Sequence, residues 1–125
     1  MTENEISRII VDSAFLIHKQ LGSGLFESVY EEILALELEE RGLRIERQKP
    51  LPVIWKEQKL EHGFRIDLMI NRKVIIEIKS IDVLAPVHYK QLLTYLRLTN
   101  CRLGLLINFN ESLIKDGIHR VVNNL

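Results

Sequence analysis

Three charged side chains stand in a part of this sequence that is otherwise nearly all apolar. Asp67 lies within residues 65–70, and Glu77 and Lys79 lie within residues 74–79. Burying an unpaired carboxylate or ammonium in such segments costs on the order of several kcal/mol per ion, so their presence indicates a site that needs them. The chemistry that fits best is a divalent cation held by the two carboxylates, beside a lysine that handles an anionic substrate.

The two apolar segments are predicted to form neighbouring antiparallel strands joined by a three-residue loop at residues 71–73. This register pairs Ile70 with Val74 and places Asp67 opposite Glu77, with Cβ atoms roughly 4.5–5.5 Å apart. Carboxylates at that distance can share one Mg²⁺, whose oxygen ligands lie at about 2.0–2.1 Å. A two-residue loop would instead put the two acids on opposite faces of the sheet.

Strand alternation predicts that Arg65, Asp67 and Met69 share one face. Two carboxylates this close repel each other, and without a cation one of them is expected to take up a proton. A cation removes that repulsion, which is the physical reason why such pairs mark metal sites.

Hydrophobic periodicity predicts the elements that hold these residues. Helices are predicted at residues 5–21, 26–41 and 86–100, and strands at residues 44–49, 53–56, 63–70, 74–79 and 103–108, with 117–122 as a candidate last edge strand. The polar residues 57–59 are expected to form a turn. The order is therefore α-α-β-β-β-β-α-β. A strand, a crossover helix and another strand indicate a parallel pair, so we expect an α/β fold with a central mixed sheet.

The second predicted helix has a broad apolar arc. Its members are Phe26, Val29, Tyr30, Ile33, Leu34, Leu36 and Leu38. Glu27 falls at the edge of this arc in helical projection, and Glu37 falls on it too. Projection alone therefore does not single out Glu27.

The third predicted helix carries further polar groups on one side. His88, Gln91 and Tyr95 recur at helical spacing and share one face. Histidines in such positions are more typically surface or capping residues than ligands, so the helix contributes Gln91 and Tyr95 as candidates.

Composition limits the class of protein. A chain of 125 residues with 46% hydrophobic and 27% charged residues is expected to form a single globular domain over residues 1–125. Its 17 basic and 17 acidic residues cancel, so charge alone does not indicate nucleic-acid binding. The single cysteine, Cys101, excludes an internal disulfide and a cysteine-rich zinc site. No apolar run approaches the roughly 20 residues that cross a bilayer, so we expect a cytoplasmic protein without a membrane partner. Trp55 is expected in the core or in an interface.

Three motifs resemble one known superfamily. Asp67 followed by Glu77-Ile78-Lys79 resembles the core of the PD-(D/E)XK nucleases. The segment from Gly24 through Glu27 to Tyr30 resembles the GxxExxY signature, which names a small family placed within that superfamily. Residues 91–95 resemble the QxxxY helix motif of its exonuclease branches. The resemblance covers roughly residues 5–122.

The resemblance implies a restriction-endonuclease-like core and a metal-dependent site. It implies that Asp67, Glu77 and the carbonyl of Ile78 bind Mg²⁺, with Mn²⁺ as a substitute. Glu27 would be a further acid near the metal, directly or through water. Lys79 would orient the attacking water or stabilise charge on the phosphate.

The remaining motif residues have supporting roles in this interpretation. Gln91 and Tyr95 would help to position the lysine or the substrate. Gly24 serves a backbone turn, and Tyr30 packs behind the site. A proline often precedes the first acid in the superfamily, whereas this chain has Ile66 there.

The leading functional hypothesis is a metal-dependent nuclease acting on DNA in repair, recombination or defence. The alternative from another class is a catalytically silent module of the same fold that binds nucleic acid or protein. A third hypothesis is a hydrolase of another phosphate ester. The small, neutral chain also favours a protein partner or a homodimer, which would enlarge the binding surface.

Overall fold

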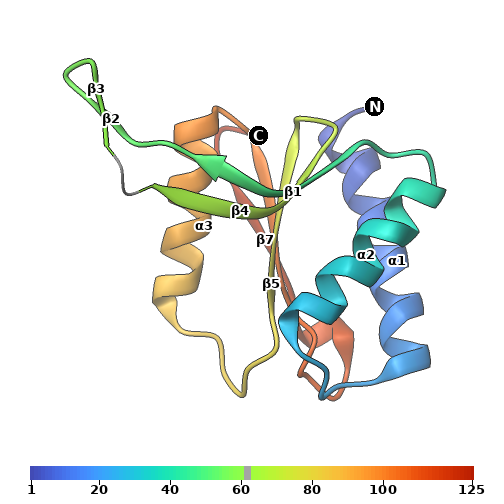
Figure 1. The fold of residues 1–125 in the computed structure, drawn as a ribbon. Coiled ribbons are helices and arrows are strands. Elements are labelled where there is room, and N and C mark those ends of the chain that lie inside the picture. Colours follow the sequence, from blue (N-terminus) through green and yellow to red (C-terminus); the bar gives the residue numbers. More distant parts are fainter. Residues whose placement is uncertain (61–62) are drawn as a thin grey trace.

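The computed structural model describes residues 1–60 and 63–125. In this part of the chain, a five-stranded sheet lies between helices α1 and α2 on one face and α3 on the other (Figure 1). The helices are α1 (Glu3–Leu21), α2 (Glu27–Glu40) and α3 (Pro86–Thr99), with a short 3₁₀ helix η1 (Ile114–Asp116). The strands are β1 (Ile45–Leu51), β2 (Ile54–Trp55), β3 (Gln58–Lys59), β4 (Phe64–Ile70), β5 (Val74–Lys79), β6 (Leu103–Asn108) and β7 (Ile118–Val122).

The sheet is mixed, as the element order predicts. Its strand order is β1-β4-β5-β6-β7. Strands β5 and β6 are parallel, and the other neighbours are antiparallel. A parallel connection needs a crossover, which α3 supplies. The expected α/β architecture with a helix-flanked mixed sheet is therefore confirmed.

Two hydrophobic clusters hold the layers together. One joins α1 and α2 to the sheet, and the other joins α3 to the opposite face. Every residue of β6 is buried, and so is every residue of β5 except Lys79. Strands covered on both faces have continuous apolar sequences, and here they lie beside and beneath the charged residues in the middle of β4 and at the end of β5.

The predicted apolar arc of α2 is too wide. Tyr30, Leu34 and Leu38 are fully buried, whereas Phe26 is 81% exposed and Leu36 is 61% exposed. Val29, at 37%, is also exposed. The helix lies against α1 and the sheet through one stripe, so apolar residues outside that stripe face solvent. None of the described helices is long and apolar enough to span a bilayer.

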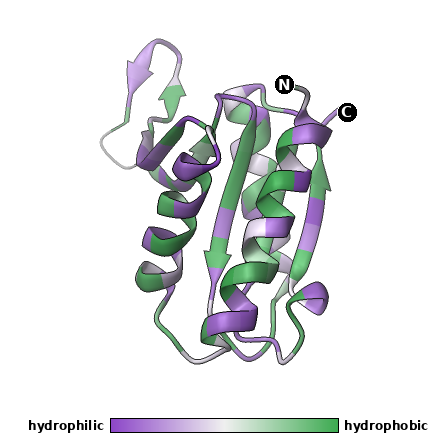
Figure 2. Ribbon diagram, turned by 90° about the vertical axis from the view of Figure 1, so that its right-hand side faces the viewer, coloured by the Kyte–Doolittle hydropathy of each residue, from purple (hydrophilic) through white to green (hydrophobic). Residues whose placement is uncertain are grey.

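Strands β2 and β3 form a separate hairpin, which corrects the prediction of a turn at residues 57–59. The turn instead consists of Lys56 and Glu57, both with positive φ (48° and 68°), so Gln58 can pair with Trp55. Positive φ at both central residues is characteristic of a type I′ hairpin turn. Figures 1 and 2 both show this hairpin standing clear of the rest of the molecule. Trp55 is 68% exposed, so it does not belong to the core.

Candidate active site

The predicted register between β4 and β5 is confirmed. Ile70 pairs with Val74 across residues 71–73, and the antiparallel pairing continues to Leu68 and Ile76. The regular pairing ends there, and the residues that follow are Asp67 on β4 and Glu77 on β5. The loop length therefore brings the two acids together, as the sequence indicates.

The two carboxylates do more than face each other. Glu77 Oε2 accepts a hydrogen bond from the backbone N–H of Asp67 at 2.8 Å. Asp67 Oδ2 accepts one from the backbone N–H of Ile78 at 2.9 Å. Each acid is thus bound to the backbone of the other strand, and both side chains are fixed by the sheet itself.

Simple alternation fails along β4 at Asp67. Ile66 and Met69 both pack in the cluster under α3 although they are three positions apart. Arg65 and Met69 therefore do not share a face, contrary to the prediction. Gln48, at the matching position of β1, has a positive φ of 47°, and this departure from extended geometry coincides with the break in β4.

The electrostatics of the pair follow from burial. Glu77 is only 5% exposed. Burial first, and then the negative charge of Asp67, raise the pKa of Glu77 to about 8. Burial also raises the pKa of Asp67, although the hydrogen bond from Ile78 opposes the shift. Without a counter-ion, Glu77 therefore holds a proton at neutral pH, and a cation between the two acids would displace it.

Lys79 lies close enough to act on both acids. Its positive charge lowers the pKa of Asp67 and of Glu77, though less than burial raises them. The side chain is half-buried, and the described part of the chain contains no ion pair that includes it. The ammonium group is thus available to an anionic substrate.

Hydrogen bonds of the loop before α2 fix the position of Glu27. The buried hydroxyl of Tyr30 donates to the Gly22 carbonyl at 2.6 Å and accepts from the Leu25 N–H at 3.2 Å. Ser80 Oγ donates to the Leu25 carbonyl at 2.7 Å. The Ser80 N–H donates to Glu27 Oε1 at 3.2 Å. Glu27 is therefore held beside the residue that follows Lys79.

Gly24 has the turn role expected from the sequence. Its φ is +104°, a conformation that residues with a Cβ rarely adopt. Tyr30 is fully buried and stacks on Phe109, with ring centroids 4.4 Å apart. Both residues build the loop that carries Glu27 and leave the chemistry to other groups.

Glu31 belongs to this site and was missed by sequence reasoning. It is only 6% exposed, and its Oε1 accepts a hydrogen bond from Gln48 Nε2 at 2.6 Å. The same Nε2 donates to Asp67 Oδ1 at 3.3 Å. Arg47 donates to Glu31 Oε2 at 3.1 Å. The available signal was its position four residues after Glu27, which puts both acids on one side of the helix.

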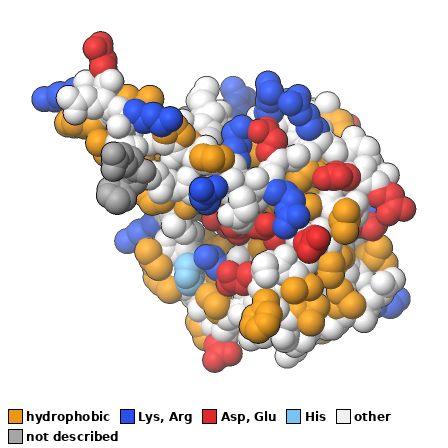
Figure 3. Space-filling model, viewed as in Figure 1, with side chains coloured by type: hydrophobic (Ala, Val, Ile, Leu, Met, Phe, Trp, Pro, Cys, Tyr) orange, Lys and Arg blue, Asp and Glu red, His pale blue; other side chains and the backbone are white. Residues whose placement is uncertain are grey.

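A groove of about 410 Å³ opens between α2 and strands β1 and β4. The residues that line it are Glu27, Ser28, Glu31, Arg47, Gln48 and Asp67. Figure 3 shows acidic and basic side chains gathered near the middle of this face of the molecule. A substrate in the groove would reach Asp67 from the α2 side.

The candidates on α3 differ in position. Tyr95 is 3% exposed, and burial followed by the charges of Glu77 and Asp67 raises the pKa of Tyr95 to about 12. Gln91 is half-buried, and no hydrogen bond of its side chain occurs among the described residues. His88 Nδ1 accepts the N–H of Ala85 at 2.9 Å, so it caps the helix. Tyr95 thus lies beside the acids, whereas the role of Gln91 stays a prediction.

Asn108 is a second residue that sequence reasoning missed. It is fully buried at the end of β6. Its Nδ2 donates to the Ile81 carbonyl at 2.9 Å, and its Oδ1 accepts the Ile81 N–H at 3.1 Å. Asn108 therefore anchors the loop that leaves the site after Lys79 and Ser80. A polar residue ending an apolar strand was the signal in the sequence.

The donor set fits a hard cation such as Mg²⁺. Among the residues that the structure describes, no three His, Cys, Asp or Glu side chains form a metal-binding group on their own. Mg²⁺ in proteins is commonly held by one or two carboxylates, with water and substrate oxygens completing its shell. Asp67 and Glu77 supply two such carboxylates, and a bound cation would relieve the repulsion between them.

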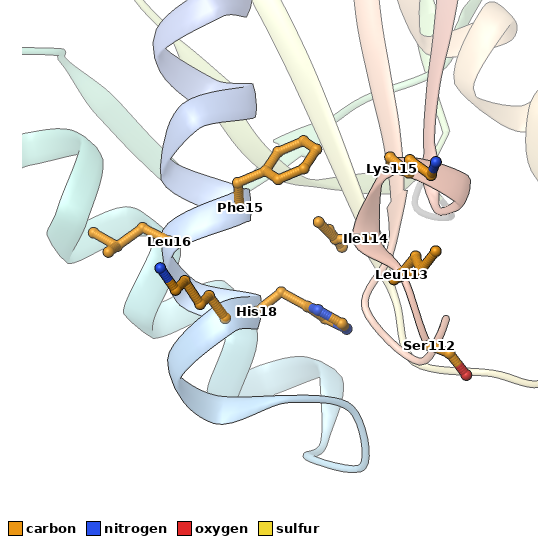
Figure 4. A pocket seen from close by; sticks show the side chains of 8 residues that line it. Phe15, Leu16, His18, Ser112, Leu113, Ile114 and Lys115 are labelled. Atoms are coloured by element: carbon orange, nitrogen blue, oxygen red, sulfur yellow. The ribbon is translucent and has the colours of Figure 1, made fainter.

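A second pocket, of about 380 Å³, lies elsewhere and is mostly apolar. In Figure 4, Phe15 and His18 project from α1 toward Ile114 of η1. None of the candidate catalytic residues lines this pocket. This pocket is therefore separate from the groove that contains Asp67.

The comparison with protein families agrees with this geometry. A family model described as "PD-(D/E)XK nuclease superfamily" matches residues 4–121. No curated protein and no solved structure matches the chain. The matched residues include Asp67, Glu77 and Lys79, the loop of residues 22–26 before α2, and α3.

Proposed function

Because the chain belongs to the PD-(D/E)XK nuclease superfamily, we propose that it is a divalent-metal-dependent nuclease that hydrolyses phosphodiester bonds in DNA. The observation that carries this proposal is the pair Asp67 and Glu77, bound to each other's strands, with Lys79 near both. A buried pair of acids with one strongly raised pKa is typical of a functional site.

In this proposal Asp67, Glu77 and the Ile78 carbonyl hold Mg²⁺, with Mn²⁺ able to substitute. When bound, the ion supplies Lewis acidity that polarises the phosphodiester and offsets its developing charge. Lys79 orients the attacking water or stabilises negative charge on the phosphate. Glu27 adds a further acid near the metal.

Two supporting residues complete the proposed site on α3. Tyr95 limits the access of water to the acids and helps to position Lys79 or the substrate. Gln91, one helical turn earlier, assists in the same positioning. Neither residue exchanges a proton in this mechanism, which agrees with the raised pKa of Tyr95.

We also propose that the chain is a member of the GxxExxY family within the superfamily. The support is that the three motif residues have separate, connected tasks. Gly24 allows the turn, Tyr30 fastens it, and Glu27 is held at the end of β5. A chance match to the motif would not require these contacts.

The decisive experiment is a cleavage assay on single-stranded, duplex and branched DNA, with Mg²⁺, Mn²⁺ or EDTA. Wild type is compared with Lys79→Ala and with Lys115→Ala, an exposed lysine in η1 that serves as the matched control. The proposal expects metal-dependent cleavage that Lys79→Ala abolishes and Lys115→Ala retains.

Other outcomes have distinct meanings. A folded wild type that binds Mg²⁺ but cuts none of these substrates needs a partner protein or another phosphate ester. A folded wild type that neither cuts nor binds Mg²⁺ is a binding module, and the nuclease proposal is then wrong.

A further inference from the structure

The β2–β3 hairpin projects at the start of β4, the strand that carries Asp67 (Figure 1). Ile54 is 64% exposed and Trp55 is 68% exposed. Large apolar side chains exposed on a projecting element indicate a binding surface. The rest of the site does not use this hairpin, so its role needs a separate explanation.

The two faces of the hairpin carry different groups. Trp55 lies opposite Gln58 on one face, and Ile54 lies opposite Lys59 on the other. The ammonium of Lys56 lies 5.8 Å from the centre of the Trp55 ring. The hairpin therefore carries an aromatic ring with Lys56 near it, and a second cation, Lys59, on its other face.

A pocket of about 260 Å³ lies at the base of the hairpin. Among its described lining residues are two cations, Lys59 and Arg65, and no acid. The other described lining residues are Pro50, Leu51, Pro52, Leu60, Gly63 and Phe64. Two cations beside an apolar wall favour a phosphate group.

This basal pocket adjoins the candidate active site. Arg65 lies two residues before Asp67 on β4, an advance of about 7 Å along an extended strand. Successive phosphates of a stacked nucleic-acid strand are about 3.4 Å apart along the axis, so the two positions are within a few nucleotides. Phe64, which also lines the pocket, packs against Tyr95 with ring centroids 5.5 Å apart.

We propose that the hairpin binds a nucleic-acid strand that has an unstacked base near the scissile phosphate. Trp55 stacks on the base, and Lys59 and Arg65 hold a phosphate of the same strand in the basal pocket. Aromatic stacking combined with a cationic groove is the usual way in which proteins hold single strands. The inference rests on the proposed nuclease function and specifies its substrate as a single-stranded stretch or a junction, rather than continuous duplex.

Intact duplex fits this surface poorly. Its bases are stacked on each other, so the Trp55 ring could cover one only after unstacking it. A protein partner could cover the apolar residues, but it would give no reason for two cations in the adjoining pocket.

The test uses the intrinsic fluorescence of the protein, because Trp55 is the only tryptophan in the sequence. Wild type in EDTA is titrated with a thymidine oligonucleotide and with a duplex of equal length, and anisotropy of a labelled copy measures total binding. The single strand should quench the emission, whereas the duplex should leave it unchanged. Trp55→Ala and Lys59→Ala should each weaken single-strand binding roughly tenfold.

Matched variants control for general effects. Leu36→Ala removes an exposed apolar side chain from α2, and Lys115→Ala removes an exposed cation from η1. Both should bind the oligonucleotide as wild type does. Trp55→Phe should keep part of the affinity that Trp55→Ala loses, because it retains a smaller aromatic ring.

Failure of this inference is separable from failure of the proposed function. Binding without any change in emission, undiminished affinity of Trp55→Ala, or no binding of single strands overturns the hairpin role even if the protein cuts DNA with Mg²⁺. An emission change that follows protein concentration alone, with a doubling of mass, would instead assign the hairpin to a second copy. Quenching by a protein that neither cuts DNA nor binds Mg²⁺ keeps the hairpin role and overturns the nuclease.

Discussion

Asp67 and Glu77 are each hydrogen-bonded to the backbone of the opposite strand. Glu77 Oε2 accepts the N–H of Asp67 at 2.8 Å, and Asp67 Oδ2 accepts the N–H of Ile78 at 2.9 Å. These bonds follow directly after the last regular pair of the β4–β5 ladder, so the sheet orients both acids before any ligand binds. The cost is electrostatic, because two carboxylates are held close together in a buried place.

The metal-free protein should therefore lose stability as the pH rises from about 4.5 to about 8. The pKa of Glu77 is raised from 4.5 to about 8 in the folded protein, so the folded state binds an extra proton in this window. Below this window Glu77 is protonated in both the folded and the unfolded protein. Above it Glu77 is ionised in both, and the burial of its charge lowers the free energy of unfolding by on the order of several kcal/mol. Urea unfolding in EDTA, at pH values across the window, measures the loss.

Glu77→Gln isolates this effect. The variant cannot ionise, so its free energy of unfolding should lack that part of the pH dependence and should exceed that of wild type above pH 8. Glu39→Gln, which changes an exposed glutamate of α2, should follow wild type. Parallel pH curves for wild type and Glu77→Gln would show that Glu77 is not destabilised by burial.

Mg²⁺ should stabilise wild type and should do so more at high pH, where the proton no longer competes for the acids. A ligand at 100 times its Kd raises the free energy of unfolding by about 2.7 kcal/mol. Asp67→Asn should lose most of this gain, whereas Asp12→Asn, an exposed change on α1, should retain it. Calorimetric melting with and without Mg²⁺ measures the shift, and equal shifts in the two variants would move the metal elsewhere.

The framework of the site could be predicted because it depends on local patterns. Residues 74–79, apart from Glu77 and Lys79, and residues 103–108 are largely apolar, and their boundaries as strands match the structure. The register of β4 on β5 followed from the length of one loop. Those features involve neighbours in sequence, so periodicity and turn length were sufficient.

The details around Asp67 depend on contacts between distant segments. Gln48 has a left-handed backbone, and its amide joins Glu31 of α2 to Asp67 of β4. No local pattern predicts that a glutamine adopts positive φ in a strand. The break in alternation between Ile66 and Met69 was unpredictable for the same reason, since it arises where β1 departs from regular pairing.

Tyr30→Phe should lower both stability and activity. The change removes a hydroxyl that donates to Gly22 at 2.6 Å and accepts from Leu25 at 3.2 Å, and leaves those groups without their partner. Such a loss costs about 1–3 kcal/mol. The loop carrying Glu27 would then be held less firmly, so kcat/KM for cleavage should fall even at temperatures where the variant is fully folded.

Tyr89→Phe is the matched control for this variant. Tyr89 is a half-buried tyrosine of α3, and its ring packs edge-on against His119. Removing its hydroxyl should leave urea unfolding and cleavage close to those of wild type. If Tyr30→Phe behaves like Tyr89→Phe in both measurements, the hydroxyl does not position Glu27.

Two substitutions of Gln48 should separate the effect of backbone strain at this residue from the effect of its side-chain amide. Both Gln48→Ala and Gln48→Gly remove the amide that bridges Glu31 and Asp67. Without this donor the two carboxylates face each other unscreened across the groove, so both variants should cut DNA more slowly. Only glycine adopts a φ of 47° without strain, so Gln48→Gly should be more stable than Gln48→Ala by about 1 kcal/mol.

The two measurements for Gln48 test different causes. Urea unfolding compares Gln48→Gly with Gln48→Ala, and equal stability would mean that the strand relaxes to ordinary geometry when the side chain is lost. The cleavage rates of both variants are compared with that of wild type. If the amide bridge matters, both variants should be slower than wild type to the same extent, despite their different backbone strain. Full activity in Gln48→Gly with loss in Gln48→Ala would instead make the conformation at residue 48, rather than the bridge, the feature that positions Asp67.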